Sequence, residues 1–348
     1  MGYYESVQNT AIKEDAVILG IESSCDETCA AVVKGDRKVL SSEIISSATE
    51  HVRYGGVVPE IASRAHTDAV SEVVKRAILS AGITFAQIDA VAVTYGAGLL
   101  GALLVGVSYA KSLAYSLKVP LIAVSHIRGH VAAAYLEDEN LKPPFISLLL
   151  SGGHTAVSVV EDYGRLKVLG STLDDAAGEA FDKVARVLSL PYPGGPNIER
   201  LAKEGKNVIE LPKMLKGEKN YNFSYSGLKT AVINYVHNKE QKGEDYNRAD
   251  VACSFQCAAL DVAVDKAIAA AKEYKIGVIA VGGGVAANGY LREELSKKCA
   301  YNAIKCVIPA KINCTDNAAM IAAEGYIQYK MKNFAALDLN AQASVSLK

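Results

Sequence analysis

Two histidines and one distant aspartate are the residues of this sequence best suited to hold a metal. His126 and His130 stand four positions apart in the segment SHIRGH. On a helix that spacing puts both imidazole rings on one face. Asp316, where we expect a helix to begin after a strand, is the third ligand that we predict. Two imidazoles and one carboxylate with open positions suit iron(II) or zinc, between which the sequence does not decide. The alternative is a pair of surface histidines and an aspartate that caps a helix.

Adjacent acidic residues, Asp26 and Glu27, follow the first apolar run of the chain. Beside bound phosphates two carboxylates would repel the ligand, unless they serve as a base or hold a metal or a water. We therefore take both as candidate catalytic residues. The alternative is that they are ordinary turn residues.

Two further charged stretches each have a functional and a structural interpretation. Asp175, Glu179 and Asp182 are expected on one side of a helix over residues 174–188, where a solvated acidic face complements the helix dipole. A basic run is either solvated surface or a local site for phosphodiester contacts. The run comprises Arg200, Lys203, Lys206, Lys213, Lys216 and Lys219.

The elements that must position these residues include two similar stretches, residues 17–33 and 145–160. Each has an apolar run, a turn of small and polar residues, a threonine and a second apolar run, which is typical of a β-hairpin. A third, glycine-rich turn over residues 281–288 lies between an expected strand and an expected helix. Such turns offer backbone N–H groups to phosphate oxygens. They predict two similar lobes facing each other across a nucleotide, and the alternative is a chance likeness of two apolar hairpins.

Strands alternate with helices in both halves, which predicts an α/β protein with mixed sheets. Further strands are expected at residues 39–47, 88–94, 120–124, 166–170, 277–281 and 303–308. Helices are expected at residues 59–81, 98–117, 126–136, 174–188, 250–274, 289–299 and 316–331. The first of them should bury Ile61, Ala65, Ala69, Val73 and Ala77 on one face.

The length of 348 residues predicts two lobes. We expect an N-terminal extension (1–15), lobe I (16–130 plus 315–335), lobe II (131–314) and a loose C-terminal tail (336–348). The break in pattern between Tyr192 and Arg248 predicts an insertion with functional loops. The pair Pro143 and Pro144 is expected to form a hinge.

The composition is that of a globular protein, with 50% hydrophobic residues and a formal net charge of -1. Such a charge argues neither for nor against nucleic acid. Seven scattered cysteines do not form a disulfide framework and suit a reducing cytosol. Residues 1–15 contain no apolar signal core, so we expect a cytoplasmic protein. The apolar stretch 98–117 is interrupted by Ser108, Lys111 and Ser112 and predicts a buried helix rather than a membrane span.

A set of motifs resembles the TsaD family, the tRNA N6-adenosine threonylcarbamoyltransferases once described as glycoproteases. They are IESSCDET (21–28), YGGVVPEIASR (54–64), LLSGGHT (149–155), DDAAGEAFDK (174–183), YPGGP (192–196), FSYSGLKT (223–230), GGGVAAN (282–288) and CTDN (314–317). Their order and extent, from residue 18 to about residue 334, make the resemblance specific. It implies the two-lobed, actin-like fold of sugar kinases and heat-shock chaperones, with duplicated sheet and helix units.

The resemblance also implies a reaction, a set of site residues and partners. The reaction is transfer of the threonylcarbamoyl group of threonylcarbamoyl-adenylate to N6 of the adenosine 3′ of the anticodon, in tRNAs reading codons that start with A, with release of AMP. The resemblance implies one divalent ion per subunit on the metal triad above, with iron(II) favoured over zinc. A TsaB-like paralogue and a TsaE-like ATPase are the implied partners. The adenylate would be held by Leu149, Leu150, Ser151, Gly152, Gly153, Asp182, Gly195, Glu199 and Asn288.

The chain departs from the family pattern at several positions. Ala97 stands where relatives usually have proline, and Ser125 where bacterial members often have histidine or asparagine. Leu149 stands where archaeal and eukaryotic relatives have a tyrosine metal ligand, which places this chain in the bacterial or organellar branch.

Three other functions are the alternatives to this one. A metalloprotease needs His-Glu-x-x-His, but Ile127 follows His126. A kinase or ATPase of the same fold would use the same phosphate-binding turns. A non-catalytic assembly module of the actin type would not need a metal triad.

Overall fold

The computed structural model describes residues 3–35, 37–215, 217–218 and 220–346. The chain divides into two compact units. Unit 1 combines Met1–Leu141 with Asp316–Leu347, so it is built from both ends of the chain. Unit 2 consists of Lys142–Thr315. Each unit is described separately below.

Unit 1 contains a five-stranded mixed sheet in the order β3-β2-β1-β4-β5. The strands are β1 (Val17–Glu22), β2 (Glu27–Lys34), β3 (Lys38–Ser46), β4 (Ala90–Gly96) and β5 (Leu121–Ser125). β1 and β2 form the expected antiparallel hairpin, whereas β4 pairs with β1, and β5 with β4, in parallel.

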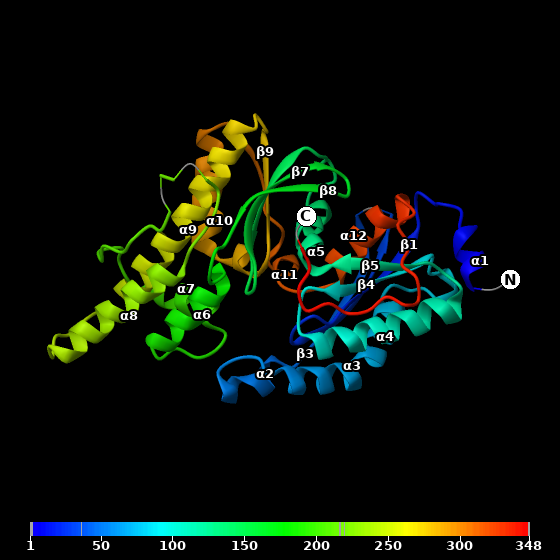
Figure 1. The fold of residues 1–348 in the computed structure, drawn as a ribbon, viewed down its shortest axis with the longest axis horizontal. Helices are drawn as coiled ribbons and strands as arrows, with labels where there is room; N and C mark the ends of the chain where they lie inside the picture. Colours follow the sequence, from blue (N-terminus) through cyan, green and yellow to red (C-terminus); the bar gives the residue numbers. More distant parts are fainter. Residues whose placement is uncertain (1–2, 36, 216, 219, 347–348) are drawn as a thin grey trace. The chain divides into compact units, whose positions relative to one another are not determined.

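Helices cover both faces of this sheet (Figure 1). On one face lie α3 (Pro59–Ser80) and α4 (Leu100–Leu117), over inward-facing residues such as Leu19 and Ile21. On the other lies α12 (Ala318–Lys330), over Ile18 and Ala92, with α5 (His126–Ala132) packed against α12. Because neighbouring residues of a strand point to opposite faces, a central strand between two layers must be apolar throughout. Smaller elements are α1 (Tyr3–Gln8), α2 (Ala48–His51), η1 (Val52–Tyr54), η2 (Phe85–Gln87) and η3 (Ala133–Leu136).

The buried face of α3 differs from the expected one. Val73 and Ala77 are buried, but Ile61, Ala65 and Ala69 are only half-buried. A polar residue takes one of the core positions, because the His66 ring lies 2.7 Å from Thr28 Oγ1 and 3.0 Å from the Cys25 carbonyl oxygen. A search for apolar residues at helical spacing misses this position. His66 can be buried because both of its ring nitrogens have hydrogen-bond partners.

Helix α4 is long and apolar enough to cross a membrane by length and composition alone. Core helices of soluble proteins share that property. In unit 1 this helix packs on β4 and on α3.

Unit 2 repeats the topology of unit 1, with strand order β10-β9-β6-β7-β8. The strands are β6 (Phe145–Leu150), β7 (Thr155–Asp162), β8 (Arg165–Ser171), β9 (Val278–Gly282) and β10 (Lys305–Val307). β6 and β7 form the second antiparallel hairpin, and β9 pairs with β6 in parallel, as β4 does with β1. The predicted duplication of hairpin and sheet is therefore confirmed.

The helices of unit 2 are α6 (Ala177–Val187), α7 (Gly194–Ala202), α8 (Ser226–Gln241), α9 (Arg248–Glu273), α10 (Gly289–Tyr301) and α11 (Lys311–Cys314), with η4 (Gly284–Ala287). The pattern break expected to be an insertion with functional loops, over residues 192–248, contains the helices α7 and α8 as well as loops. Their buried residues, such as Ile198 and Val232, belong to the main core of the unit.

Helix α6 begins at Ala177, three residues later than expected. Asp175 therefore precedes the helix and does not share a helical side with Glu179 and Asp182, so that prediction is wrong. Its carboxylate instead accepts hydrogen bonds from Lys183 Nζ at 2.8 Å and from Lys229 Nζ at 2.7 Å. This pairing joins α8 to α6.

The C-terminal segment is not loose as far as the structure describes it. Ala335 N donates to the Leu121 carbonyl at 2.8 Å, and Gln342 N donates to the Tyr95 carbonyl at 2.8 Å. Ala341 is buried in the core of unit 1. The segment follows the sheet because its alternate apolar side chains add to that core.

Candidate functional site

The metal triad comes together within unit 1. One ligand atom from each of His126, His130 and Asp316 lies within 4.8 Å of the others. Asp316 Oδ1 is 3.5 Å from His126 Nε2 and 3.3 Å from His130 Nε2. The two rings meet edge to face, with centroids 4.6 Å apart. The geometry of three converging ligand atoms is that of an open divalent metal site.

Two helix starts position these ligands. Helix α5 begins at His126 directly after β5, so its first turn presents both imidazoles on one side. Asp316 lies two residues before α12 begins, and Asn317 rather than Asp316 caps that helix, by accepting from Met320 N at 2.9 Å. The alternative that Asp316 serves as the cap of α12 is thus wrong, and its carboxylate faces the histidines.

The surroundings of His130 fit a bound cation. The side chain is only 1% exposed. Among the residues that the structure describes, neither ring nitrogen makes a hydrogen bond of normal geometry. A buried polar atom without a partner costs about 1–3 kcal/mol. A divalent ion on Nε2 removes that cost, so the residues present are compatible with a metal.

A buried glutamate, which sequence reasoning missed, orients His126. Glu22 Oε2 lies 3.0 Å from His126 Nδ1 and accepts from Thr94 Oγ1 at 2.6 Å. Glu22 Oε1 accepts from Ser24 N at 2.5 Å, and Ser24 Oγ lies 3.1 Å from His126 Nδ1. With Nδ1 engaged, Nε2 is the nitrogen directed at the metal. One signal for this role was present in the sequence, since Glu22 ends an otherwise apolar strand. A carboxylate buried at such a place requires partners, which points to a function for it.

These charges shift the pKa values of the two histidines in opposite directions. Burial opposes protonation of His126, but the carboxylates of Asp316 and Glu22 raise its pKa to about 9. Burial, together with the adjacent His126, lowers the pKa of His130 below its ordinary value. Burial would raise the pKa of Glu22, yet the neighbouring His126 lowers it. The site therefore holds an ionised Glu22 against His126, while His130 stays neutral, the form in which an imidazole binds metal.

The acidic pair Asp26 and Glu27 also belongs to unit 1, where it links the β1–β2 hairpin to β3. The Asp26 carbonyl accepts from Ser47 N and Ser47 Oγ, each at 2.9 Å. Burial and then the charge of Asp26 raise the pKa of Glu27 to about 9. A carboxyl group with that pKa is protonated at neutral pH, which disfavours Glu27 as the group that accepts a proton.

In unit 2, two turns lie side by side at the carboxyl ends of parallel strands. β6 runs into Ser151, Gly152 and Gly153, and β9 runs into the glycines that follow Val281. Gly152 and Gly153 are exposed, and a Cβ atom at either position would contact nothing within 4 Å. Leu149 and Leu150 are buried strand residues behind the turn. Exposed backbone amides at such a turn are suited to phosphate oxygens.

Replacing Gly283 with alanine is expected to lower the free energy of unfolding by about 2 kcal/mol. The residue has a φ of 91°, which costs a side chain roughly 1–2 kcal/mol, and its Cβ would lie 2.4 Å from the Leu150 carbonyl oxygen. Urea denaturation measures the change. Gly284 is the matched control, because a Cβ there meets nothing within 4 Å. Equal stability of the two variants would show that the close approach of β9 and β6 is not as described.

The remaining residues expected to hold the adenylate surround these turns, and several have structural partners. Asp182 Oδ1 accepts from Gly194 N, the residue before Gly195, at 2.7 Å, and burial raises its pKa. Glu199 Oε1 accepts from Gly289 N at 3.2 Å. Asn288 caps α10 through its oxygen and donates its Nδ2 to Gln256 Oε1 at 2.8 Å. The structure thus ties the start of α7 to α6 through Asp182, and the second half of α7 to the start of α10 through Glu199.

The basic run of residues 200–219 is partly neutralised. Lys213 pairs with Asp261 at 2.6 Å and Lys203 with Glu199 at 3.2 Å, whereas Lys206 is exposed. Arg200 donates to the side-chain oxygen of Asn197. Lys216 and Lys219 lie outside the described residues. An RNA surface here would have to compete with these ion pairs.

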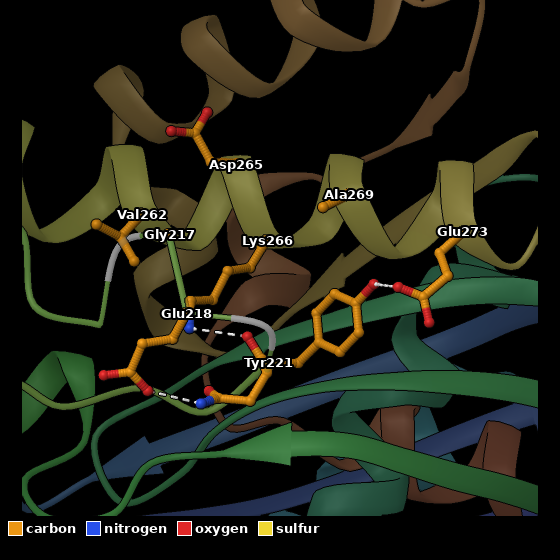
Figure 2. A pocket seen from close by; sticks show the side chains of 9 residues that line it. Gly217, Glu218, Tyr221, Val262, Asp265, Lys266, Ala269 and Glu273 are labelled. Carbon is orange, nitrogen blue, oxygen red and sulfur yellow. Dashed lines mark hydrogen bonds between the residues drawn. The ribbon is translucent and has the colours of Figure 1, made fainter.

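A cavity of about 530 Å³ lies beside α9 in unit 2 and contains none of the expected site residues (Figure 2). Its polar lining is paired internally. Lys266 Nζ donates to the carbonyls of Asn220 and Asn222, and Tyr221 Oη donates to Glu273 at 2.7 Å. These bonds fasten residues 220–222 to the helix, which is a structural role.

Comparison with known sequences identifies one family. The model of the TsaD family, tRNA N6-adenosine threonylcarbamoyltransferase, matches residues 38–323. A relative of that name from Clostridium perfringens (strain SM101) is 52% identical over 332 residues, covering 95% of this chain and 98% of the relative. Another from Clostridium botulinum (strain 657) is 52% identical over 337 residues, covering 97% and 99%.

Solved structures support the fold at low sequence identity. Full-length HypF in its phosphate- and nucleotide-bound form has a TM-score of 0.63 and 17% identity, covering 92% of this chain and 57% of that one. Component A of the Acidaminococcus fermentans (R)-2-hydroxyglutaryl-CoA dehydratase has a TM-score of 0.53 and 16% identity, covering 90% and 99%. These likenesses confirm the predicted actin-like fold.

Proposed function

The chain belongs to the tRNA N6-adenosine threonylcarbamoyltransferase family of transferases, and on that premise we propose its substrates and mechanism. The donor is threonylcarbamoyl-adenylate. The acceptor is N6 of the adenosine 3′ of the anticodon, in tRNAs that read codons starting with A, and AMP is released. The observation that carries the proposal is the convergence of His126, His130 and Asp316, in which Asp316 Oδ1 lies within 3.5 Å of Nε2 of both buried histidines.

The metal site holds one divalent ion, iron(II) in preference to zinc. A bound ion of this kind supplies Lewis-acid polarisation of a carbonyl oxygen, here that of the threonylcarbamoyl group. His126, His130 and Asp316 hold it, and Glu22 keeps Nε2 of His126 directed at it. The carbonyl is already activated as a mixed anhydride of carbamate and phosphate, so no covalent nucleophile from the protein is needed.

The turn of residues 151–153 in unit 2 binds the phosphate of the adenylate. Its backbone amides stabilise the charge that develops on the departing phosphate. Asp182, Gly195, Glu199 and Asn288 complete the adenylate site around the ends of β6 and β9. Asp26 is the better of the two hairpin carboxylates for removing the N6 proton, since the raised pKa of Glu27 keeps that group protonated.

The direct test combines purified protein, threonylcarbamoyl-adenylate and unmodified tRNA, followed by mass analysis of the nucleosides. We expect modified adenosine with a mass gain of one threonylcarbamoyl group, and loss of the product when the metal is removed by a chelator and not restored. The target base must leave the stacked anticodon loop, as base-modifying enzymes generally require. A second arm with ATP and small acceptors tests the kinase alternative. The assay also contains the TsaB-like paralogue and the TsaE-like ATPase. Phosphoryl transfer to a small acceptor, with no modified tRNA formed, would reject the proposal.

The partner surface of unit 1 is the exposed side of α3 and α4, which pack on one another. Leu79, Leu100, Leu104 and Tyr115 are large apolar residues exposed on these helices. We assign this surface to a TsaB-like paralogue, and add a TsaE-like ATPase as a further partner. All these steps use cytoplasmic substrates, so the protein is assigned to the cytoplasm.

Replacing Leu104 with aspartate is expected to weaken binding of the TsaB-like paralogue about tenfold or more. A hot-spot residue near the centre of an interface costs about 2 kcal/mol or more when it is truncated, and a buried charge adds to the loss. Titration calorimetry or analytical ultracentrifugation measures the change. The matched control is Tyr301→Asp, because Tyr301 is 90% exposed in unit 2. Unchanged binding by Leu104→Asp would place the paralogue elsewhere.

A further inference from the structure

Residues 335–345, the C-terminal strap, run along unit 1 and end against the loop that follows β4. We propose that the end of this strap is a positioning element for the metal site, which fixes the orientation of His126 through two intervening layers of residues. The inference rests on the proposed metal site, but the strap itself contains no metal ligand.

The strap closely contacts residues 95–98, which are the end of β4 and the first residues of the loop that follows it; this segment is called the loop below. Gln342 N donates to the Tyr95 carbonyl at 2.8 Å, and Gly98 N donates to the Ala343 carbonyl at 3.1 Å. A Cβ atom at Gly96 would lie 2.4 Å from the Gln342 carbonyl oxygen and 2.5 Å from Val345 Cγ2. The loop and the strap therefore touch backbone to backbone, with no room for a methyl group between them.

The same loop contacts the residues that hold His126. Leu99 N donates to the Ser24 carbonyl at 2.8 Å, and a Cβ at Gly98 would lie 2.5 Å from that oxygen. Thr94 Oγ1, at the end of β4, donates to Glu22 Oε2. Since Ser24 and Glu22 both meet His126 Nδ1, a shift of the loop changes the support of the imidazole ring.

The strap is anchored separately from its end. Its first part is held by the bond from Ala335 to Leu121, by the bond from Lys111 Nζ to the Leu339 carbonyl at 2.8 Å, and by burial of Ala341 in the core. Residues 342–344 are exposed on their other side. A truncation after Ala341 therefore removes the contacts with the loop and leaves the apolar anchors in place.

The experiment compares that truncation, Gly96→Ala and the two combined with the full chain. Each single change is expected to weaken Zn²⁺ binding about tenfold, within the range of roughly 10–100-fold for outer partners of metal-binding histidines. Competition with a chromophoric chelator measures the affinity. In the combined variant no further loss is expected, because the three atoms nearest a Cβ at residue 96 all belong to the strap. A truncation after Ser346 is the matched control and should bind like the full chain.

Amide hydrogen exchange gives a readout that needs no metal. We expect faster exchange in peptides covering residues 22–26 and 94–99 of the truncated protein, with a urea midpoint that shows it is folded. Unchanged affinity and unchanged exchange, or additive losses in the combined variant, would overturn the inference. If the full chain binds no Zn²⁺, the proposed metal site fails, and the exchange result alone then decides whether the strap holds Ser24 and Glu22.

Discussion

Alanine in place of His130 is expected to abolish metal binding and, with it, threonylcarbamoyl transfer. The ring is buried, and its Nε2 lies 3.3 Å from Asp316 Oδ1 at the centre of the triad. Loss of an outer partner of a metal-binding histidine costs roughly 10–100-fold in affinity. Loss of one of only three protein ligands should cost more than ~100-fold. Elemental analysis after dialysis against excess metal gives the content, and nucleoside mass analysis gives the product.

The control for this variant is His237→Ala, because His237 is exposed on α8 in unit 2. It should keep full metal content and full transfer. Urea denaturation of both variants separates loss of metal from loss of fold. A His130→Ala protein that is folded, retains one metal per chain and modifies tRNA at the normal rate would reject the metal site.

Glutamine in place of Glu22 is expected to reduce metal affinity by up to ~100-fold, although it changes neither the size nor the shape of the side chain. The Ser24 N–H is a fixed donor 2.5 Å from Glu22 Oε1. The glutamine oxygen must therefore occupy that position, which places its NH₂ group where Oε2 now faces His126 Nδ1. An NH₂ group only donates, so in the neutral ring it favours Nδ1 as the acceptor and the ring proton on Nε2.

A proton on Nε2 blocks the nitrogen that is directed at the metal. In this variant the His126 ring therefore keeps its position but is in the tautomer that cannot bind the metal. Proton-detected or ¹⁵N NMR of the imidazole nitrogens reports the tautomer directly. Ser24→Ala is the graded comparison, since it removes one contact to Nδ1 and leaves the Glu22 carboxylate in place. Wild-type affinity in Glu22→Gln would show that the carboxylate does not orient His126.

Much of the fold follows from patterns that can be read without coordinates. The strands of both hairpins are apolar on both faces and end in small polar turns, so their duplication was predictable. The metal triad was predictable in part, because His126 and His130 stand where β5 ends and α5 begins. Asp316 was expected to follow a strand, but it lies between the short helix α11 and the start of α12. Which of the two neighbours caps α12 was not predictable, because Asp316 and Asn317 are both good capping residues by type. Backbone geometry makes Asn317 the cap.

Other parts could not be predicted, since they depend on contacts between segments far apart in sequence. Glu22 is one acidic residue among many until Thr94 and His126 are brought to it across the sheet. The late start of α6 follows from Asp174, whose carboxylate accepts from Tyr225 N at 2.7 Å, some fifty positions away. The C-terminal segment looks polar, yet its alternate apolar residues extend the core.

Unit 1 is assembled from both ends of the chain, with α12 lying against the strands made first. During translation, unit 2 can therefore acquire its core while the sheet of unit 1 still lacks one covering layer. The side chains of Ile18 and Ala92, which α12 covers in the folded protein, stay exposed to solvent or to chaperones during that interval. The third ligand of the proposed metal site, Asp316, is also the first residue of the returning segment, so that site is complete only after the ribosome has passed position 316.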